Sequence, residues 1–336
     1  MTKKKINTRK PMSPEARARI AEGMKKAAEL KRLQMGLEPA SAITGESRRE
    51  KPLELIKMKD QYFDPILFQP MKTGKPIDKL FSTDGGIPRA TNFMLIGDPG
   101  IGKSTVTLDI LSDLKQAGHK TLFISAEMTR IDLYQYVQRY PKFGEVDILF
   151  LGEYLDDNPK VLLEELLDQG YDAVLIDSFT EVMEAIKEGN GMSSSGAEKF
   201  IIDLMVKHNL AGNKEKRYTA FIAIAQMTKG GTFVGSNKLK HNTSGMCEIR
   251  FDSNGSAFIF FSKNRRGPVN KKMYFSLKES GDVVYDDRRF LLDQESKEFL
   301  DEEKKRLEEE EDAFDVLFGT GDLDAPENDG TDYIRR

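Results

Sequence analysis

The sequence has a single cysteine, Cys247, among its 336 residues. One cysteine excludes an internal disulfide and a four-cysteine zinc site within this chain. No run of about 18 apolar residues occurs, so no membrane-spanning helix is expected. The lysines near the N-terminus are not followed by an apolar segment, which argues against a secretory signal. These absences predict a cytoplasmic protein in a reducing setting, without membrane contact.

Charge is distributed unevenly along the chain. Hydrophobic residues make up 39% and charged residues 32% of the sequence, which indicates a packed core with polar tails. The net charge of −4 conceals an excess of basic residues up to Lys51 and an excess of acidic residues after Asp293. This asymmetry suggests two tails with different partners.

The two tails carry distinct signals. Ser13-Pro14-Glu15 is typical of a helix start, and it predicts a basic helix over 14–34 within a basic N-terminal segment and linker, 1–60. That helix is either a nucleic-acid-binding arm or a charged helix that is solvated or packs on a neighbouring subunit. The acidic segment 291–336 is expected to be partly disordered. It could recruit replication or recombination proteins, or compete with DNA for basic loops.

The segment between the tails, 61–290, has the alternating pattern of an α/β core. Nearly continuous apolar runs at 173–176 and 220–225 suit strands that are buried on both faces, as in a parallel sheet. After 245 the pattern changes to strands without helices, which predicts an antiparallel extension of the sheet. The expected helices are 105–116, 160–169 and 196–209. The expected strands are 92–96, 121–126, 147–151, 172–178, 219–226, 246–251, 256–262, 272–277 and 282–285.

The most informative motif lies between the first strand and the first helix of this core. It fits G-x-x-x-x-G-K-S/T, the P-loop that wraps backbone N–H groups around nucleotide phosphates. The helix N-terminus adds partial positive charge, Lys103 reaches the β- and γ-phosphates, and Ser104 ligates Mg²⁺. The predicted phosphate-binding residues are Gly97, Asp98, Pro99, Gly100, Ile101, Gly102, Lys103, Ser104 and Thr105.

Two carboxylates are candidates for the hydrolytic chemistry. Asp177 ends an apolar strand, where the Walker-B acid that holds Mg²⁺ belongs. It is followed by Ser178 rather than by glutamate, so Glu127, at the end of strand 121–126, is the predicted catalytic base. We expect Glu127 to overlook the γ-phosphate from a strand that lies beside the P-loop strand.

Three further residues complete the predicted catalytic set. Gln226 ends strand 219–225 and is expected to sense the γ-phosphate or hold the attacking water. Lys263 and Arg265 follow a strand in a cluster of cations, and we expect them to reach the nucleotide of a neighbouring subunit. Two Gly-rich loops, 189–195 and 228–243, are predicted to leave the active face and contact single-stranded nucleic acid through their backbone.

ATP is the expected nucleotide. No N-K-x-D sequence follows the P-loop, so the guanine-recognition motif of GTPases is missing. An L-S-G-G-Q signature is also missing, which argues against a transporter ATPase.

Taken together, these motifs resemble those of the RecA-like ATPases, and most closely the RadA group. The resemblance covers about 72–268: the entry residues Gly85-Gly86-Ile87-Pro88, the P-loop, the strand ending at Glu127, the strand ending at Asp177, Thr228-Lys229-Gly230-Gly231, and Lys263-Asn264-Arg265 with Gly267. In that group the last two motifs relate to DNA-linked activity and to contacts around the nucleotide between subunits. The resemblance therefore implies an Mg²⁺-dependent ATPase that assembles as a ring or filament, expected to be hexameric, on single-stranded DNA in recombination, repair or replication.

The chain also departs from the RadA pattern. It lacks the cysteines of the N-terminal zinc finger, and about 45 residues after Phe290 leave no room for a Lon-like domain. Arg266 replaces the phenylalanine of the K-N-R-F-G motif, while Ser125-Ala126-Glu127-Met128 and Gln226 are similar to DnaB-type helicases. Two alternatives stay open: a DnaB-type helicase core, and a KaiC-like regulatory ATPase that acts through protein partners.

Overall fold

The computed structural model describes residues 19, 22–24, 26–27, 55, 57–225, 242–293 and 302–309. The chain divides into two compact units, 1–62 and 63–336. In the first unit, the described residues from Arg19 to Ala27 are helical and exposed, within the range predicted for the basic helix. None of the described helices combines the length and the apolar character needed to cross a bilayer.

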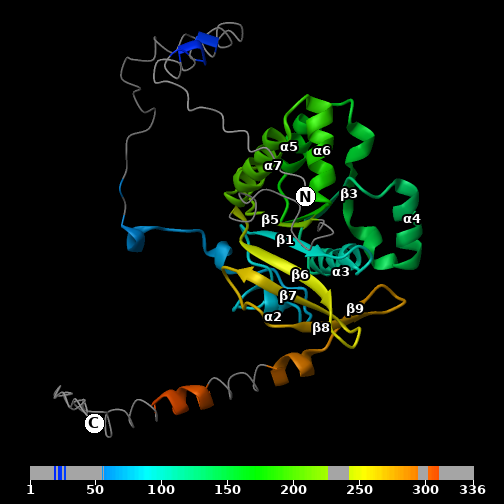
Figure 1. Ribbon diagram of the computed structural model, residues 1–336. Helices are drawn as coiled ribbons and strands as arrows, with labels where there is room; N and C mark the ends of the chain where they lie inside the picture. The colour runs from blue at the N-terminus through cyan, green and yellow to red at the C-terminus, as the bar shows by residue number, and fades with distance from the viewer. Residues whose placement is uncertain are drawn as a thin grey trace, which may run out of the picture. The chain divides into compact units, whose positions relative to one another are not determined.

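The second unit is built around a nine-stranded sheet with the order β3-β2-β4-β5-β1-β6-β7-β8-β9 (Figure 1). Strands β1 to β6 pair in parallel, and β7 to β9 pair antiparallel. The predicted mostly parallel α/β sheet with an antiparallel extension is therefore confirmed. The strands are β1 Asn92–Gly97, β2 Thr121–Ser125, β3 Asp147–Phe150, β4 Ala173–Asp177, β5 Ala220–Ala225, β6 Gly245–Phe251, β7 Ala257–Asn264, β8 Met273–Leu277 and β9 Val283–Tyr285.

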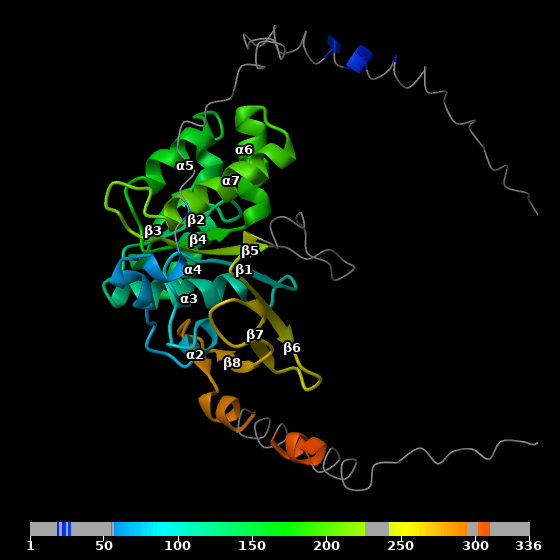
Figure 2. The ribbon, with the colours of Figure 1, turned by 90° about the vertical axis from the view of Figure 1, so that its left-hand side faces the viewer.

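Helices cover both faces of the parallel strands. Alternate side chains of each strand point to opposite faces, so Phe93 and Leu95 enter the cluster beneath α3, while Met94 and Ile96 enter the cluster beneath α5, α6 and α7. Figure 2 shows these two helical layers on either side of the strands. The α-helices are α2 Asp78–Phe81, α3 Lys103–Gln116, α4 Arg130–Arg139, α5 Pro159–Leu167, α6 Phe179–Asn190 and α7 Ser194–Asn209; the 3-10 helices are η2 Met58–Asp60, η3 Pro65–Phe68, η4 Pro141–Glu145 and η5 Leu151–Tyr154.

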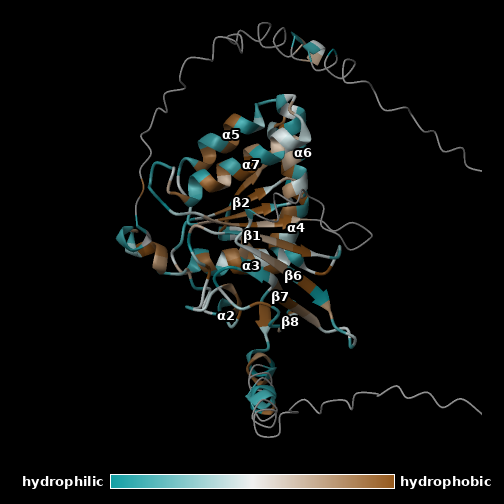
Figure 3. Cartoon of the chain, turned by 60° about the vertical axis from the view of Figure 1, so that its left-hand side comes forward, coloured by the Kyte–Doolittle hydropathy of each residue, from teal (hydrophilic) through white to brown (hydrophobic). Residues whose placement is uncertain are grey.

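The apolar residues concentrate where the two layers meet the sheet. In Figure 3 the strands β1 and β2 are largely hydrophobic, whereas α5 and α7 show hydrophilic residues along their outer sides. Strands β1, β2, β4 and β5 are buried along their whole length. This explains why their sequences are nearly continuous apolar runs instead of alternating ones.

The position of β2 corrects one expectation. It does not lie beside the P-loop strand β1, because β4 and β5 lie between them. Instead β2 pairs with β4, with Ser125 opposite Asp177, and the amide of Ala126 donates to the carbonyl of Asp177 at 3.0 Å. The strand that precedes Glu127 thus ends beside the Walker-B strand, a neighbour relationship that sequence alone does not specify.

The C-terminal strands start from an edge of the parallel sheet. β6 pairs in parallel with β1, and the antiparallel part begins with β7. The β6–β7 and β8–β9 hairpins turn at Gly255 and Gly281, whose φ angles of 79° and 85° favour glycine. Their Ser-Asn-Gly and Ser-Gly-Asp sequences are typical of tight turns.

The segment 189–195 is not the mobile loop that its composition suggested. α6 extends to Asn190, Gly191 ends it in a left-handed conformation, and the hydroxyl of Ser193 accepts from the amide of Gly196 as the cap of α7. The side chain of Asn190 also accepts from the amide of Lys160 at 3.2 Å. Gly and Ser serve here as helix stop and start signals in a tight helix–helix turn.

Candidate active site

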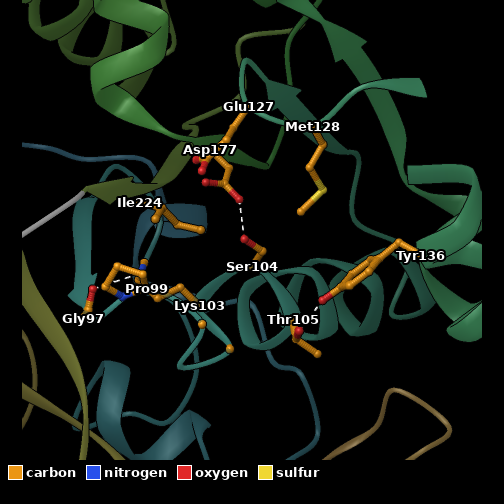
Figure 4. A pocket seen from close by; sticks show the side chains of 12 residues that line it. Gly97, Pro99, Lys103, Ser104, Thr105, Glu127, Met128, Tyr136, Asp177 and Ile224 are labelled. Carbon is orange, nitrogen blue, oxygen red and sulfur yellow. Dashed lines mark hydrogen bonds between the residues drawn. The ribbon is translucent and has the colours of Figure 1, made fainter. Parts of the chain in front are cut away.

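A cavity of about 430 Å³ lies at the carboxyl ends of the parallel strands. Its volume is in the range of small-molecule binding sites. The cavity brings together Lys103, Ser104, Glu127 and Asp177, which the sequence places far apart (Figure 4). The full lining is Gly97, Pro99, Gly100, Gly102, Lys103, Ser104, Thr105, Glu127, Met128, Tyr136, Asp177 and Ile224.

The loop between β1 and α3 has the backbone of a phosphate cradle. Gly100 and Gly102 have φ angles of 76° and 95°, a region that L side chains rarely adopt. At Gly97 a Cβ atom would lie 2.8 Å from the carbonyl oxygen of Ile249 in β6, so strand packing also requires glycine there. Asp98, Pro99 and Gly100 are exposed at the mouth of the loop, whereas Ile101 is buried beneath it.

Lys103 begins α3 and lies over this loop. Its ammonium donates to the carbonyl oxygens of Gly97 and Asp98, both at 2.9 Å. Burial lowers the pKa of Lys103, while the charges of Asp177, Glu127 and Asp98 act in the opposite direction. The ammonium of Lys103 is thus already placed at the loop. In a nucleotide complex, phosphate oxygens would replace its two carbonyl contacts.

Ser104 and Asp177 form the polar centre of the cavity. The Ser104 hydroxyl donates to Oδ2 of Asp177 at 2.6 Å, as Figure 4 shows. Burial raises the pKa of Asp177 to about 6; Glu127 adds to this effect, and the Ser104 bond and Lys103 oppose it. Hard oxygen ligands of this kind suit Mg²⁺, which keeps several waters and phosphate oxygens in its coordination shell. Among the described residues no cluster of three His, Cys, Asp or Glu side chains could hold a metal ion.

Glu127 reaches the cavity from the turn between β2 and α4. Figure 4 shows its side chain next to Asp177, above Ser104. Its carboxylate raises the pKa of Asp177, which reflects their proximity. The structure therefore brings Glu127 into the predicted constellation although β2 is not adjacent to β1.

The remaining predicted catalytic residues lie elsewhere. Gln226 falls outside the described residues, as does loop 228–243 up to position 241. Lys263 lies opposite Met246 at the start of β6, and its ammonium donates to the carbonyl of Thr243 at 2.8 Å. Arg265 follows at the same edge, where its amide donates to the carbonyl of Ser244 at 3.0 Å. Since β6 runs parallel to β1, this edge is opposite the one that carries the P-loop.

Three lining residues were missed by sequence reasoning: Met128, Tyr136 and Ile224. Ile224 belongs to a predicted strand, but whether its side chain lines the cavity depends on the order of the strands in the sheet. Tyr136 lies on α4, a helix that was not predicted. Thr129 and Asp132 form a capping box at its start, and Leu133, Tyr136 and Val137 are its core-facing residues. Those signals could have revealed the helix.

Comparisons with known proteins show which families this chain is similar to. A family model described as "ATPase: KaiC" matches residues 71–148, which include the P-loop, Glu127 and Tyr136. The DNA repair protein RadA of Mycobacterium tuberculosis is 25% identical over 257 residues, 76% of this chain and 52% of that protein. RadA of Chlamydia trachomatis is 30% identical over 200 residues, 59% of this chain and 41% of that protein.

The domain has the fold of a RecA-like P-loop NTPase core and is similar to part of RadA. The chain spans about half the length of the curated relatives it matches. Among solved structures, the RadB recombinase aligns with 64% of this chain and 98% of its own, with 18% identity and a TM-score of 0.47.

The RecA-like domain accounts for the arrangement of the site. The predicted phosphate loop follows β1, the predicted Walker-B acid Asp177 ends β4, and Glu127 follows β2, so all three come from carboxyl ends of parallel strands. In open α/β sheets ligands bind in the crevice at these ends. The predicted similarity to the RecA-like ATPases, and to RadA in particular, is thereby confirmed.

Proposed function

We propose that this chain is an ATP-hydrolysing motor of the RecA/RadA type that acts on single-stranded DNA in recombination, repair or replication. The observation that carries the proposal is the cavity in which Ser104 donates to Asp177 while Lys103 and Glu127 line the same space. Phosphate binding, metal binding and a carboxylate for water are the parts that phosphoryl transfer to water requires.

Each residue then has a defined task. Gly97 to Thr105 hold the phosphates through backbone amides, and Lys103 exchanges its two carbonyl contacts for phosphate oxygens. Ser104 ligates Mg²⁺ directly, Asp177 holds it through water, and the bound metal neutralises charge on the phosphates. Glu127 orients a water molecule and accepts its proton as that water attacks. Gln226 relays the state of the nucleotide to loop 228–243, which contacts DNA.

The site is completed by a neighbouring copy of the chain. Lys263 and Arg265 lie at the edge of the sheet where β1 begins, whereas the P-loop follows the end of β1. Three strand residues, on the order of 10 Å, separate the level of Lys263 in the sheet from the start of the P-loop. This position supports a role for Lys263 and Arg265 at the nucleotide of an adjacent subunit in a ring or filament, expected to be hexameric.

The decisive experiment measures the ATPase rate with and without single-stranded DNA, together with the mass of the assembly in the presence of ATP. We expect DNA to raise the rate and ATP to stabilise an assembly larger than a monomer. A rate that does not respond to DNA at any salt concentration would reject the DNA motor. If DNA does raise the rate, strand-displacement assays would separate a DnaB-type helicase from a recombination ATPase.

A second candidate is favoured by the family match. Residues 71–148 match a model described as "ATPase: KaiC", which is compatible with a regulatory ATPase whose output is protein interaction. DNA-independent hydrolysis combined with stable binding of a protein partner through the basic or acidic tail would support this candidate against the DNA motor.

A further inference from the structure

The helix α4 starts three residues after Glu127, and its core-facing residues are only partly buried. None of its residues is buried, and Ile131 and Tyr134 are 71% and 66% exposed. Helices gain most of their stability in proteins from packing an apolar face. The position of α4, and with it the turn that carries Glu127, therefore depends on a few individual contacts.

One of these contacts reaches the phosphate-binding helix. The hydroxyl of Tyr136, in the middle of α4, is hydrogen-bonded to Oγ1 of Thr105, as Figure 4 shows. Thr105 is 8% exposed and follows Ser104 in the first turn of α3. Among the described hydrogen bonds, this is the one that joins α4 directly to α3. Burial raises the pKa of Tyr136, so its hydroxyl remains protonated at neutral pH.

The ring of Tyr136 is held from the other side. It packs edge-on against Tyr140 with centroids 4.9 Å apart, and it stacks on Phe143 at 5.7 Å. The β8–β9 turn backs this aromatic cluster, because a Cβ atom at Gly281 would lie 2.4 Å from the Tyr140 ring. The cluster leaves the Tyr136 ring little room to move sideways.

Besides Tyr136, α4 packs the partly buried Leu133 and Val137 against the core, and its other polar attachments are weaker or local. Arg130 forms a two-pronged ion pair with Glu153 at 2.5 and 2.6 Å, but both side chains are substantially exposed. Exposed pairs contribute little to stability. The capping box of Thr129 and Asp132 lies within the first turn of α4 itself. Tyr136 is thus the contact that relates α4 to the phosphate-binding helix.

We propose that Tyr136 is a positioning residue for ATP hydrolysis: through its bond to Thr105 it fixes α4 against the P-loop helix and so holds Glu127 at the distance from the γ-phosphate that water attack needs. The inference rests on the proposed ATPase function. A carboxylate displaced by about 1 Å can lose up to a hundredfold in rate without any loss of nucleotide binding.

The test compares ATP turnover with ADP affinity in the full-length chain. Tyr136→Phe removes the hydroxyl and keeps the ring; we expect kcat to fall about tenfold while the Kd for ADP stays within twofold. Thr105→Val should lower kcat similarly, and the double variant should lose no more than either single one. Tyr134→Phe, an exposed tyrosine on the same helix, is the matched control and should be unchanged.

The outcomes separate this inference from the function on which it rests. A wild-type chain that binds ATP without hydrolysing it would overturn both. Normal wild-type turnover with unchanged kcat in Tyr136→Phe would overturn the inference alone. A parallel loss of ADP affinity and turnover would also overturn it, since Tyr136 would then belong to the binding surface. Additive losses in Thr105→Val and Tyr136→Phe would show that the two hydroxyls act separately.

Discussion

The hydroxyl of Ser104 and the carboxylate of Asp177 are joined by a 2.6 Å hydrogen bond across 73 positions of sequence. The bond connects the first turn of the P-loop helix to the end of β4. Both groups are oxygen ligands suited to Mg²⁺, and they are already oriented toward each other before any ligand is considered. The proposed metal-binding half of the site is therefore built into the packing of α3 against the parallel sheet.

Replacing Glu127 separates binding from chemistry. Glu127→Gln keeps the shape of the side chain but removes its ability to accept a proton, so we predict a fall in kcat of at least about 100-fold. ATP affinity, measured by equilibrium binding, should be nearly unchanged because Lys103 and the loop amides remain. Glu145→Gln, at an exposed position in η4, serves as the control. Hydrolysis at the wild-type rate would remove Glu127 from the mechanism.

A subunit-mixing experiment tests whether Lys263 and Arg265 act on a neighbour. Arg265→Ala alone should lower ATP turnover by about 1000-fold, as expected for a cationic finger. Mixing Arg265→Ala with Glu127→Gln chains restores sites that combine an intact Glu127 with an intact Arg265. With random mixing at equal amounts, about a quarter of the interfaces are complete, so about a quarter of the wild-type rate should return.

The same mixture distinguishes action in trans from action within one chain. If Arg265 served its own nucleotide, no chain in the mixture would hold both groups, and the rate would stay at the level of the separate variants. Lys263→Ala mixed with Glu127→Gln gives an independent version of the test. Light scattering should confirm in each case that the assemblies form.

The parts of the site that sequence could predict are those encoded locally. The loop from Gly97 to Ser104 is one continuous motif, and Asp177 ends an apolar run, so each can be recognised without knowing the strand order. Alternating apolar runs and helix signals also indicated the α/β class. These features depend on residues near one another in the chain, where propensity and periodicity are informative.

Two of the features that were not predicted depend on long-range packing, and one depends on an ambiguous local signal. Glu127 was expected on a strand next to β1, but β2 lies beside β4, and the order of parallel strands is decided by crossover connections. The segment 189–195 was predicted as a loop because Gly and Ser also end and begin helices. The capping box of α4 could have revealed the helix that carries Tyr136, but not its contact with Thr105, which is 31 positions away. The place of β2 beside β4 and the contact between Tyr136 and Thr105 are not visible in a local pattern.

A buried ionic network supports the P-loop helix and gives a stability prediction. Asp109 of α3 is fully buried and pairs with Lys75 at 2.7 Å and with Lys142. Lys75 and Lys142 also pair with Asp113, one turn along the helix. Burial raises the pKa of Asp109, and the hydrogen bonds from Lys142 and Lys75 oppose this. The two lysines thus compensate carboxylates that are costly to bury.

Removing the central carboxylate leaves two lysines poorly compensated. We predict that Asp109→Ala lowers the free energy of unfolding by about 3–5 kcal/mol, measured by urea denaturation at pH 7. Lys199→Ala breaks an exposed ion pair with Asp203 on α7. This variant should change the free energy of unfolding by less than about 0.5 kcal/mol. A loss below about 1 kcal/mol for Asp109→Ala would contradict a stabilising role for this network.

His208, near the end of α7, gives a prediction for the pH dependence of stability. Its side chain is fully buried, and neither ring nitrogen has a hydrogen-bond partner among the described residues. Burial lowers the pKa of His208 from 6.5 to about 4, with Lys207 acting in the same direction and Asp168 opposing it. The folded state therefore binds the proton more weakly than the unfolded state.

The sign of the effect follows from this difference. Stability that depends on neutral His208 is complete above about pH 6.5 and is lost as the pH falls toward 4, by up to about 3 kcal/mol. His208→Phe keeps a ring of similar size without a titrating group. At each pH, the free energy of unfolding of His208→Phe, measured by urea denaturation, is subtracted from that of the wild type. The difference cancels the titrations of the carboxylates and of the other histidines. A difference that does not grow between pH 6.5 and 4.5 would show that His208 accepts its proton in the folded state as readily as in the unfolded chain.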